Sequence, residues 1–429
     1  MQNSKFSVKR KVCNLFLTLF ANEKGEVLEH PGISMLGRSG NDWVVPEDRE
    51  MIPLPRGASL VSLPDCVPVG LDYNEELTYF ESAPGSDNKI SAVAALLPQG
   101  FTRILMPACV NRNPEKNLPL FGYAAVGLKN NQIYVAAVKT DQHRKWHPVN
   151  YNTEGLPARI NKMLRKYPGN RILRQLARCS LEYSCFTAQN IFYQRWEGGI
   201  PTMPKCNANC IGCISESHQK VASPQERLNF KAEVNEIVEI GIEHLTNARE
   251  AIISFGQGCE GEPSLNAQNL SQAITIIRGQ TEQGTININT NAGYFSGIKK
   301  ICDAGLDSMR VTMFSCNEEH YMNYHRPASY SLKDVENSID YAKDKGVKVA
   351  LNLLTFPGFT DREEEVEALL YFLEGHRIDM VQLRNLNIDP DYLSNRFPGD
   401  SGIGILNFID ILKQESPRVK IGSYSHPVR

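Results

Sequence analysis

The stretch Lys205-Cys206-Asn207-Ala208-Asn209-Cys210-Ile211-Gly212-Cys213 says most about the fold of this chain. It places three cysteines in a C-x3-C-x2-C pattern on one short loop, and no fourth cysteine follows closely. Clusters that only carry electrons normally have four thiolate ligands, so three thiolates leave one iron of a [4Fe–4S] cube with an open position. The spacing therefore predicts that Cys206, Cys210 and Cys213 bind a cluster whose open iron accepts a substrate or cofactor.

A zinc site is the alternative interpretation of these cysteines. Zinc sites with three thiolates normally take a histidine as the fourth ligand, and His218 follows the loop closely. Free cysteines are also often buried with no metal at all. The cysteines alone thus leave a cluster, a zinc ion and inert packing open.

The chain after Ile191 alternates between strand and helix patterns, which predicts a parallel sheet with crossover helices. With one strand before the cysteine loop, the expected strands are residues 251–255, 285–289, 308–314, 347–353 and 380–386. The expected helices are residues 224–246, 270–278, 296–304, 332–345, 361–375 and 403–413.

The cysteine triplet and this alternation together resemble the radical S-adenosylmethionine (SAM) superfamily. The resemblance implies an α/β fold with a partial (β/α)6 barrel at residues 186–429, including a C-terminal extension. It implies a [4Fe–4S] cluster and SAM as cofactors, and an electron donor such as flavodoxin or ferredoxin. Reductive cleavage of SAM then gives a 5′-deoxyadenosyl radical, which abstracts hydrogen from a substrate. Where the family usually has an aromatic residue beside the adenine, this chain has Ile211.

Residues 1–185 differ from the rest and predict a β-rich α+β accessory domain. Short apolar runs alternate with turn signals, and residues 121–128 and 133–138 predict a hairpin. Near the end of this domain, residues 155–178 carry seven basic residues and no acidic one. A surface helix with a solvated basic face is one interpretation, and contact with an anion or an RNA backbone is the other.

The ends of the predicted strands carry the expected SAM contacts, because barrel active sites lie where strands open into loops. Residues 254–263 resemble the family's Gly-Gly-Glu-Pro motif, which implies that Gly258, Gly261 and Glu262 bind the SAM ammonium group. The remaining expected cofactor contacts are Asn289, Asn291, Ser315, Asn352 and Ile211.

Residues near the same strand ends are candidates for catalysis and substrate binding. The catalytic candidates are Cys259, Cys316, His320 and His325, as hydrogen-atom donors or acid–base groups. The substrate candidates are Arg384, Asn385 and Asn387, which follow one another along the polar end of the last strand. Cys179 and Cys185 are candidate ligands of an auxiliary cluster.

Composition restricts the compartment and the partners. The formal net charge is −2 over 429 residues, so no global field attracts nucleic acid or an anionic membrane. Eleven cysteines without a disulfide pattern favour a reducing cytoplasm. The apolar run at residues 12–20 predicts a buried strand rather than a signal peptide, and no run is long enough to span a bilayer.

The substrate is not encoded in any of these motifs, and it is left open as a small molecule, a peptide or RNA. Two further functions remain open beside the general radical SAM reaction. One is an RNA-modifying radical SAM enzyme. The other is a non-enzymatic iron–sulfur or zinc-binding protein.

Overall fold

The computed structural model describes residues 16–142 and 144–429. Of the strand predicted at residues 12–20, residues 16–20 are described, and residues 12–15 lie outside the described part. By its internal contacts the chain forms two compact units. The β-rich unit contains the described part of Met1–Thr140 with Thr355–Glu367 and Asn385–Gln414, and the barrel unit contains the remainder. This division differs from the boundary expected at residue 185, because the helices before that boundary belong to the barrel unit.

The β-rich unit is built on a large antiparallel sheet with the strand path β10-β15-β14-β1-β2-β7-β12, onto which further strands pair. A second sheet has the order β11-β3-β4. The strands are β1 (Leu17–Asn22), β2 (Val27–Met35), β3 (Gly37–Ser39), β4 (Asp42–Val44), β5 (Met51–Pro53), β6 (Ser59–Leu63), β7 (Cys66–Leu71), β8 (Leu77–Tyr79), β9 (Ile90–Leu96), β10 (Phe101–Arg103), β11 (Met106–Pro107), β12 (Cys109–Asn111), β13 (Tyr123–Ala124), β14 (Val126–Lys129) and β15 (Gln132–Lys139).

The predicted hairpin of this unit is confirmed. Strands β14 and β15 pair antiparallel, with Lys129 opposite Gln132. The two residues between them, Asn130 and Asn131, have φ angles of 51° and 60°. Both lie in the left-handed region, which a two-residue type I′ turn requires and which asparagine tolerates better than most residues.

The barrel unit is built on a parallel sheet with the order β16-β17-β18-β19-β20-β21-β22. Its strands are β16 (Arg195–Gly199), β17 (Arg249–Phe255), β18 (Thr285–Thr290), β19 (Ser308–Met313), β20 (Lys348–Thr355), β21 (Met380–Asn385) and β22 (Lys420–Gly422). Its helices are α1 (Leu156–Lys166), α2 (Arg171–Glu182), α3 (Phe186–Tyr193), α4 (Val234–Asn247), α5 (Ala267–Gln280), α6 (Phe295–Asp303), α7 (Glu318–His325) and α8 (Leu332–Asp344). Helices α9 (Glu363–Gly375) and α11 (Ile405–Glu415) run from one unit into the other, and α10 (Pro390–Ser394) lies in the β-rich unit.

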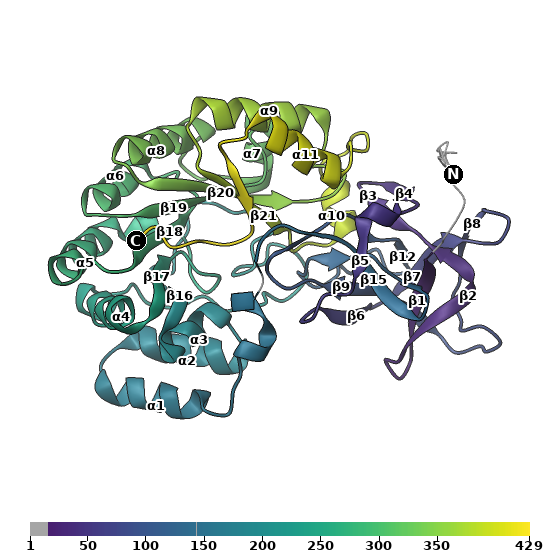
Figure 1. Cartoon of the computed structure of the whole chain (residues 1–429), viewed down its shortest axis with the longest axis horizontal. Coiled ribbons are helices and arrows are strands. Elements are labelled where there is room, and N and C mark those ends of the chain that lie inside the picture. The colour runs from purple at the N-terminus through teal and green to yellow at the C-terminus, as the bar shows by residue number, and fades with distance from the viewer. Residues whose placement is uncertain (1–15, 143) are drawn as a thin grey trace. The chain divides into compact units, whose positions relative to one another are not determined.

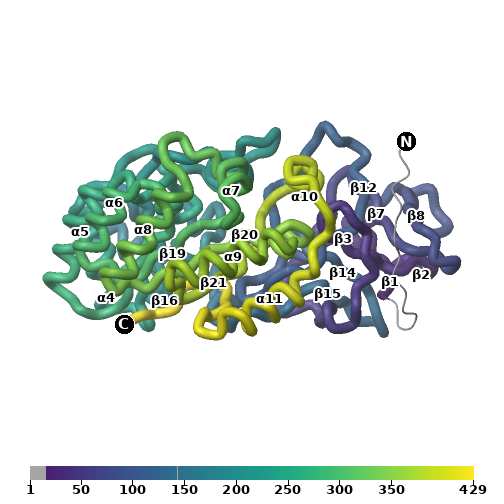
Figure 2. The backbone as a smooth tube through the Cα atoms, turned by 90° about the horizontal axis from the view of Figure 1, so that it is seen from above, coloured from purple at the N-terminus to yellow at the C-terminus, as the bar shows by residue number. Residues whose placement is uncertain are grey.

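The arrangement is the predicted half-barrel. Figure 1 shows a curled sheet with helices α4, α5, α6 and α8 on its outer side, and the view in Figure 2 again places α4, α5 and α6 outside the strands. The strand stretches expected from the sequence match β17 to β21. Two details differ. Helix α4 begins at Val234 rather than near residue 224, and the short strand β22 was not predicted.

The parallel order gives the sheet two distinct edges. All seven strands leave the sheet at one edge by their carboxyl ends and enter it at the other by their amino ends. The cysteine loop follows the carboxyl end of β16, so it lies at the edge where barrel active sites are found. Among the described residues, no helix has the length and apolar character needed to cross a membrane.

Candidate functional site

The cysteine loop is held in place by the end of helix α7. The backbone N–H of Ile211 donates to the carbonyl of Tyr324 at 3.0 Å, and that of Asn209 donates to the carbonyl of His325 at 3.1 Å. A β-bridge between Ala208 and Pro327 adds a further contact. Ile211 is buried, so it packs within the protein as expected of a residue at that position.

His325 connects this helix directly to one of the three cysteines. Its Nε2 accepts from the backbone N–H of Phe314 at 3.2 Å, and its Nδ1 lies 3.3 Å from the Sγ of Cys210. A backbone N–H can only donate, so in the neutral ring Nε2 is the acceptor and Nδ1 carries the hydrogen. Burial lowers the pKa of His325 to about 3. Both ring nitrogens are engaged by the protein, which favours a positioning role toward Cys210 over the predicted acid–base role.

Cys213 has a cationic neighbour. A terminal nitrogen of Arg227 lies 3.7 Å from the Cys213 Sγ. The Nε of Arg227 donates to Ser215 at 3.0 Å, and an ion pair with Glu216 holds the guanidinium from the other side. The arginine is thereby fixed beside a predicted ligand sulfur, which no sequence pattern indicated.

The three thiols are close enough to influence one another electrostatically. Burial is the main cause that raises the pKa of Cys206 to about 11, and burial followed by the neighbouring thiols Cys213 and Cys206 raises that of Cys210 further. Metal coordination is the chemistry that deprotonates such thiols outright. Within the described residues, no three side chains of His, Cys, Asp or Glu group as ligands of a single metal ion. A cluster distributes its thiolates over different irons, so its ligands need not converge on one point. The donor set fits a cluster.

The loop after β17 packs against the cysteine loop, as the predicted SAM motif requires. A Cβ at Gly261 would lie 2.1 Å from the carbonyl oxygen of Lys205, so only glycine permits this approach. The N–H groups of Gly261 and Glu262 donate to the carbonyls of Met203 and Lys205 at 2.7 and 2.9 Å. At Gly258, an added Cβ would meet the side chain of Gln225.

Glu262 is a buried carboxylate that forms no ion pair with any described residue. It accepts from the backbone N–H of Ser264 at 3.0 Å, from that of Asn291 at 2.8 Å and from the hydroxyl of Thr290. Burial raises its pKa, since no cation offsets the loss of hydration. A bound ammonium group would supply that cation, so the site fits the amino group of SAM.

Glu260 was not among the predicted site residues, and it is also buried. One of its oxygens accepts from the N–H groups of Gly256 and Gln257 at 2.6 and 2.7 Å, and the other accepts from that of Thr202 at 2.7 Å. It therefore ties the loop after β17 to the segment that leads into the cysteine loop. In the sequence, the only indication of this role is that Glu260 is a second carboxylate directly before the Gly-Glu-Pro turn.

The two asparagines expected after the third strand connect neighbouring parts of the site. The Nδ2 of Asn291 donates to the side chain of Asn207 in the cysteine loop at 2.7 Å. The Nδ2 of Asn289 donates to the carbonyl of Gly256 at 3.1 Å. Both lie at the predicted edge, and their present partners are protein groups.

Ser315 and Asn352 are the remaining expected cofactor contacts. Ser315 is buried and accepts from the N–H of Asn317 at 2.9 Å. The Nδ2 of Asn352 lies 3.5 Å from the hydroxyl of Thr312, and its buried Oδ1 has no hydrogen-bond partner among the described residues. A buried acceptor without a partner is unusual in proteins and fits a donor on a bound ligand.

The catalytic candidates lie in different surroundings. Cys259 is buried and hydrogen-bonded to Cys179, with Cys185 close by, so these three cysteines form one cluster of thiols. Cys316 and His320 are partly buried beside and within α7. Their catalytic roles stay predictions.

The three substrate candidates do not share one unit. Arg384 belongs to the barrel unit and donates to the carbonyl of Ser423 at 2.8 Å. Asn385 and Asn387 belong to the β-rich unit. The amide of Asn385 accepts from the N–H of Arg103 at 2.9 Å and donates to the carbonyl of Phe101 at 3.1 Å, so it holds strand β10. Their substrate roles stay predictions.

Comparison with known proteins agrees with this geometry. Residues 200–370 match the family model of the radical SAM superfamily. That range includes the cysteine loop, Glu262 and strands β17 to β20. The chain therefore contains a radical SAM domain, and members of this superfamily bind a [4Fe–4S] cluster and SAM.

Similar curated proteins come from two bacteria. GTP 3′,8-cyclase of Thermodesulfovibrio yellowstonii is 28% identical over 186 residues, which cover 42% of this chain and 52% of that protein. The probable dual-specificity RNA methyltransferase RlmN of Chlorobium phaeobacteroides is 24% identical over 209 residues, which cover 44% and 56%. The chain thus spans about half the length of these relatives. Among solved structures, a radical SAM methyltransferase from Sphaerobacter thermophilus is 16% identical with a TM-score of 0.41, covering 53% of this chain and 66% of that one.

Proposed function

We propose that this protein is a radical SAM enzyme that cleaves SAM reductively and uses the resulting radical to abstract hydrogen from its substrate. One observation carries the proposal. The loop with the three cysteines packs directly against the Gly261–Glu262 turn, where Glu262 is buried without a cation. A cluster on the thiolates and an ammonium group on the carboxylate would occupy neighbouring places.

In this proposal the side chains of the protein bind and orient the cofactors. Cys206, Cys210 and Cys213 would hold the cluster, and Glu262 would bind and orient the amino group of SAM. When bound, these cofactors supply the reductive cleavage of SAM to methionine and a 5′-deoxyadenosyl radical. The stacked rings of Phe314 and Tyr324, 4.1 Å apart and fully buried, exclude water from the side of Cys210.

Arg384 is the proposed substrate contact. Burial is the main cause that lowers its pKa to about 10, and the neighbouring Arg310 adds to the effect. The neighbouring Glu197 acts in the opposite direction, and its carboxylate accepts a hydrogen bond from Ser254. An anionic group on the substrate would be bound favourably by the Arg384 guanidinium.

An RNA substrate is less well supported. Of the seven basic residues at residues 155–178, three form ion pairs within the protein. Lys166 pairs with Glu243, Arg171 with Glu236, and Arg178 with both Glu182 and Glu226. Two of these pairs attach helices α1 and α2 to helix α4, so part of the segment has a structural role. We propose a cytoplasmic location and an electron donor of the flavodoxin or ferredoxin type.

The test is anaerobic reconstitution with iron and sulfide, followed by SAM and dithionite. The expected result is about four irons per chain, as in one cube, and formation of 5′-deoxyadenosine. A variant with Cys206, Cys210 and Cys213 all changed to Ala serves as the control. Iron and sulfide retained at the same level in that variant would overturn the assignment, as would a loaded wild-type protein that leaves SAM intact.

An Arg384→Ala variant separates substrate binding from SAM cleavage. If Arg384 contacts the substrate, the variant loses substrate turnover and keeps slow, uncoupled formation of 5′-deoxyadenosine. If Arg384 only holds the carbonyl of Ser423, both activities decline together with the stability of the fold.

A further inference from the structure

The barrel unit contains a second hollow, away from the cysteine loop. It has a volume of about 1190 Å³. Its wall includes Ser308, Lys348, Met380 and Lys420, which are the first residues of strands β19, β20, β21 and β22. The cavity therefore lies at the amino-terminal edge of the parallel sheet, whereas the cysteine loop and Glu262 lie at the carboxyl-terminal edge.

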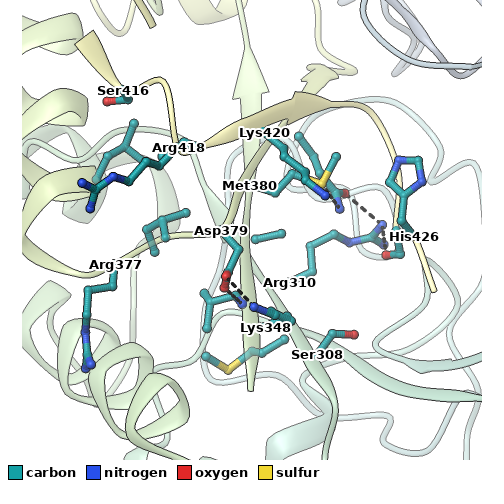
Figure 3. A pocket seen from close by; sticks show the side chains of 18 of the residues that line it. Ser308, Arg310, Lys348, Arg377, Asp379, Met380, Ser416, Arg418, Lys420 and His426 are labelled. Atoms are coloured by element: carbon teal, nitrogen blue, oxygen red, sulfur yellow. Dashed lines mark hydrogen bonds and ion pairs between the residues drawn. The ribbon is translucent and has the colours of Figure 1, made fainter. Parts of the chain in front are cut away.

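The wall of this cavity is positively charged, although the chain as a whole has a net charge of −2. Its basic residues outnumber its acidic ones. The basic residues are Arg310, Lys348, Arg377, Arg418 and Lys420, and the acidic ones are Glu374, Asp379 and Glu415. In Figure 3, Arg310, Lys420 and His426 lie on one side of the Lys348–Asp379 pair, and Arg377 and Arg418 lie on the other. Cationic groups thus border both halves of the cavity.

The cations are only partly compensated by the protein. Asp379 is shared between Lys343 and Lys348, so one carboxylate serves two ammonium groups. The side chains of Arg418 and Lys420 are exposed, and neither forms an ion pair or a hydrogen bond with a described side chain. Surface cations of this kind are often simply solvated, so a cation at the inner end of the cavity is stronger evidence for an anion site.

Arg310 forms that inner end. One terminal nitrogen donates to the side chains of Gln382 and Ser425, both at 3.3 Å, and both acceptors are neutral. Its Nε is buried and has no hydrogen-bond partner among the described residues. No described carboxylate lies within ion-pair distance of this guanidinium. The arginine is partly buried, and the charge of the neighbouring Glu197 acts on it without an ion pair. Keeping such a charge in a partly buried site is costly, and an anion in the cavity would offset that cost.

Part of the wall is apolar. It includes Met309, Val349, Leu370, Leu373 and Met380. A hollow of this size with apolar walls and a few fixed polar groups is typical of sites for small organic molecules. We propose that this cavity binds a small organic anion, with a phosphate or carboxylate group directed to Arg310 and an apolar body against the methionine and leucine side chains.

Calorimetric titration of the reconstituted protein at low salt tests the proposal. The probes are phenyl phosphate, benzoate and the neutral benzyl alcohol. We expect saturable binding of at least one anion, at least tenfold tighter than that of benzyl alcohol, and the tighter anion identifies the headgroup. Binding of no probe, or equal binding of all three, would overturn the proposal.

Two variants locate the bound anion. Arg310→Met removes the inner charge and keeps the length of the side chain, and we expect it to weaken binding at least tenfold. Because a buried change can impair folding, the double variant Arg418→Ser, Lys420→Ser tests the exposed rim independently, with an expected loss of three- to tenfold. The double variant Lys162→Ser, Arg165→Ser is the matched control, because it removes two equally exposed charges from helix α1. Equal losses in both double variants would indicate only a general charge effect and would refute the site.

Excess SAM separates this cavity from the proposed active site. If the anion binds at the amino-terminal edge, SAM leaves its affinity unchanged. Displacement by SAM would place the anion in the cofactor site instead and end the proposal. The measurement needs no turnover, so it stands whether or not the protein forms 5′-deoxyadenosine.

Discussion

The contact between His325 and Cys210 predicts a shift in the reduction potential of the cluster. The Nδ1–H of His325 points to the Cys210 sulfur across 3.3 Å, and the backbone N–H of Phe314 fixes the ring through Nε2. Hydrogen bonds to cluster sulfurs raise the reduction potential, because they stabilise the more negative reduced state. Replacing His325 by Phe removes the donor and keeps an aromatic ring of similar size.

The magnitude follows from the energy of one such bond. A hydrogen bond to a charged group contributes about 1.5–3 kcal/mol, and we take roughly a third to a half of this as the gain on reduction. At 59 mV per tenfold change for one electron, about 0.5–1.5 kcal/mol corresponds to a decrease of roughly 20–60 mV. The variant also leaves the buried N–H of Phe314 without an acceptor, which costs about 1–3 kcal/mol of stability.

A potentiometric titration followed by electron paramagnetic resonance measures this shift on the reconstituted protein. The matched control is His244→Phe, because His244 is also fully buried and bonds to a backbone carbonyl, that of Trp196, at 2.8 Å. Its change has a similar stability cost and touches no predicted cluster ligand. An unchanged potential in the His325 variant, or an equal shift in both variants, would refute the reasoning.

Three further predictions concern the loops and the core. Glu262→Gln should weaken SAM binding by about 10- to 150-fold, from the 1.5–3 kcal/mol of a bond to a charged group, with unchanged iron content in the same samples; unaltered affinity would remove Glu262 from the SAM site. Gly261→Ala should reduce cluster loading, because its Cβ would meet the Lys205 carbonyl at 2.1 Å, and iron analysis at full loading would contradict this. Burial lowers the pKa of His244 to about 4, so the unfolded chain binds this proton at a higher pH than the folded one does. Stability should therefore fall by about 1.5 kcal/mol as the pH decreases from 6.5 to 5, and urea unfolding of the cluster-free protein should show a flatter pH dependence in His244→Phe.

The half-barrel could be predicted because its signals are local, and the proposed cluster ligands rest on a local signal of the same kind. The C-x3-C-x2-C spacing determines which thiols share one loop, and the alternation of strand and helix patterns determines a parallel sheet with crossovers. Glu262 was found for the same reason, since it follows a glycine-rich strand end. Where the local signal was weak, the prediction failed: β22 has three residues, too few to show an alternating pattern.

The positions that depend on distant partners could not be predicted. The amide of Asn385 holds the backbone of Phe101 and Arg103, more than 280 residues earlier in the chain, and no local pattern indicates these partners. The thiols of Cys179 and Cys259 were judged separately, because nothing in either neighbourhood indicates the other. The ion pairs of Lys166 and Arg171 could not be predicted either, because their partners Glu243 and Glu236 lie in the later helix α4.

The sequence by itself thus determined the class of domain and the parallel half-barrel, and it indicated three candidate cluster ligands. Each of these depends on residues that are close in the chain or on a repeated pattern. Only the tertiary structure decided that His325 supports Cys210, that Glu262 is buried without a cation, and that four strand starts enclose a cationic cavity around Arg310. These features arise from side chains that the fold brings together over long sequence separations, and no local pattern records such contacts.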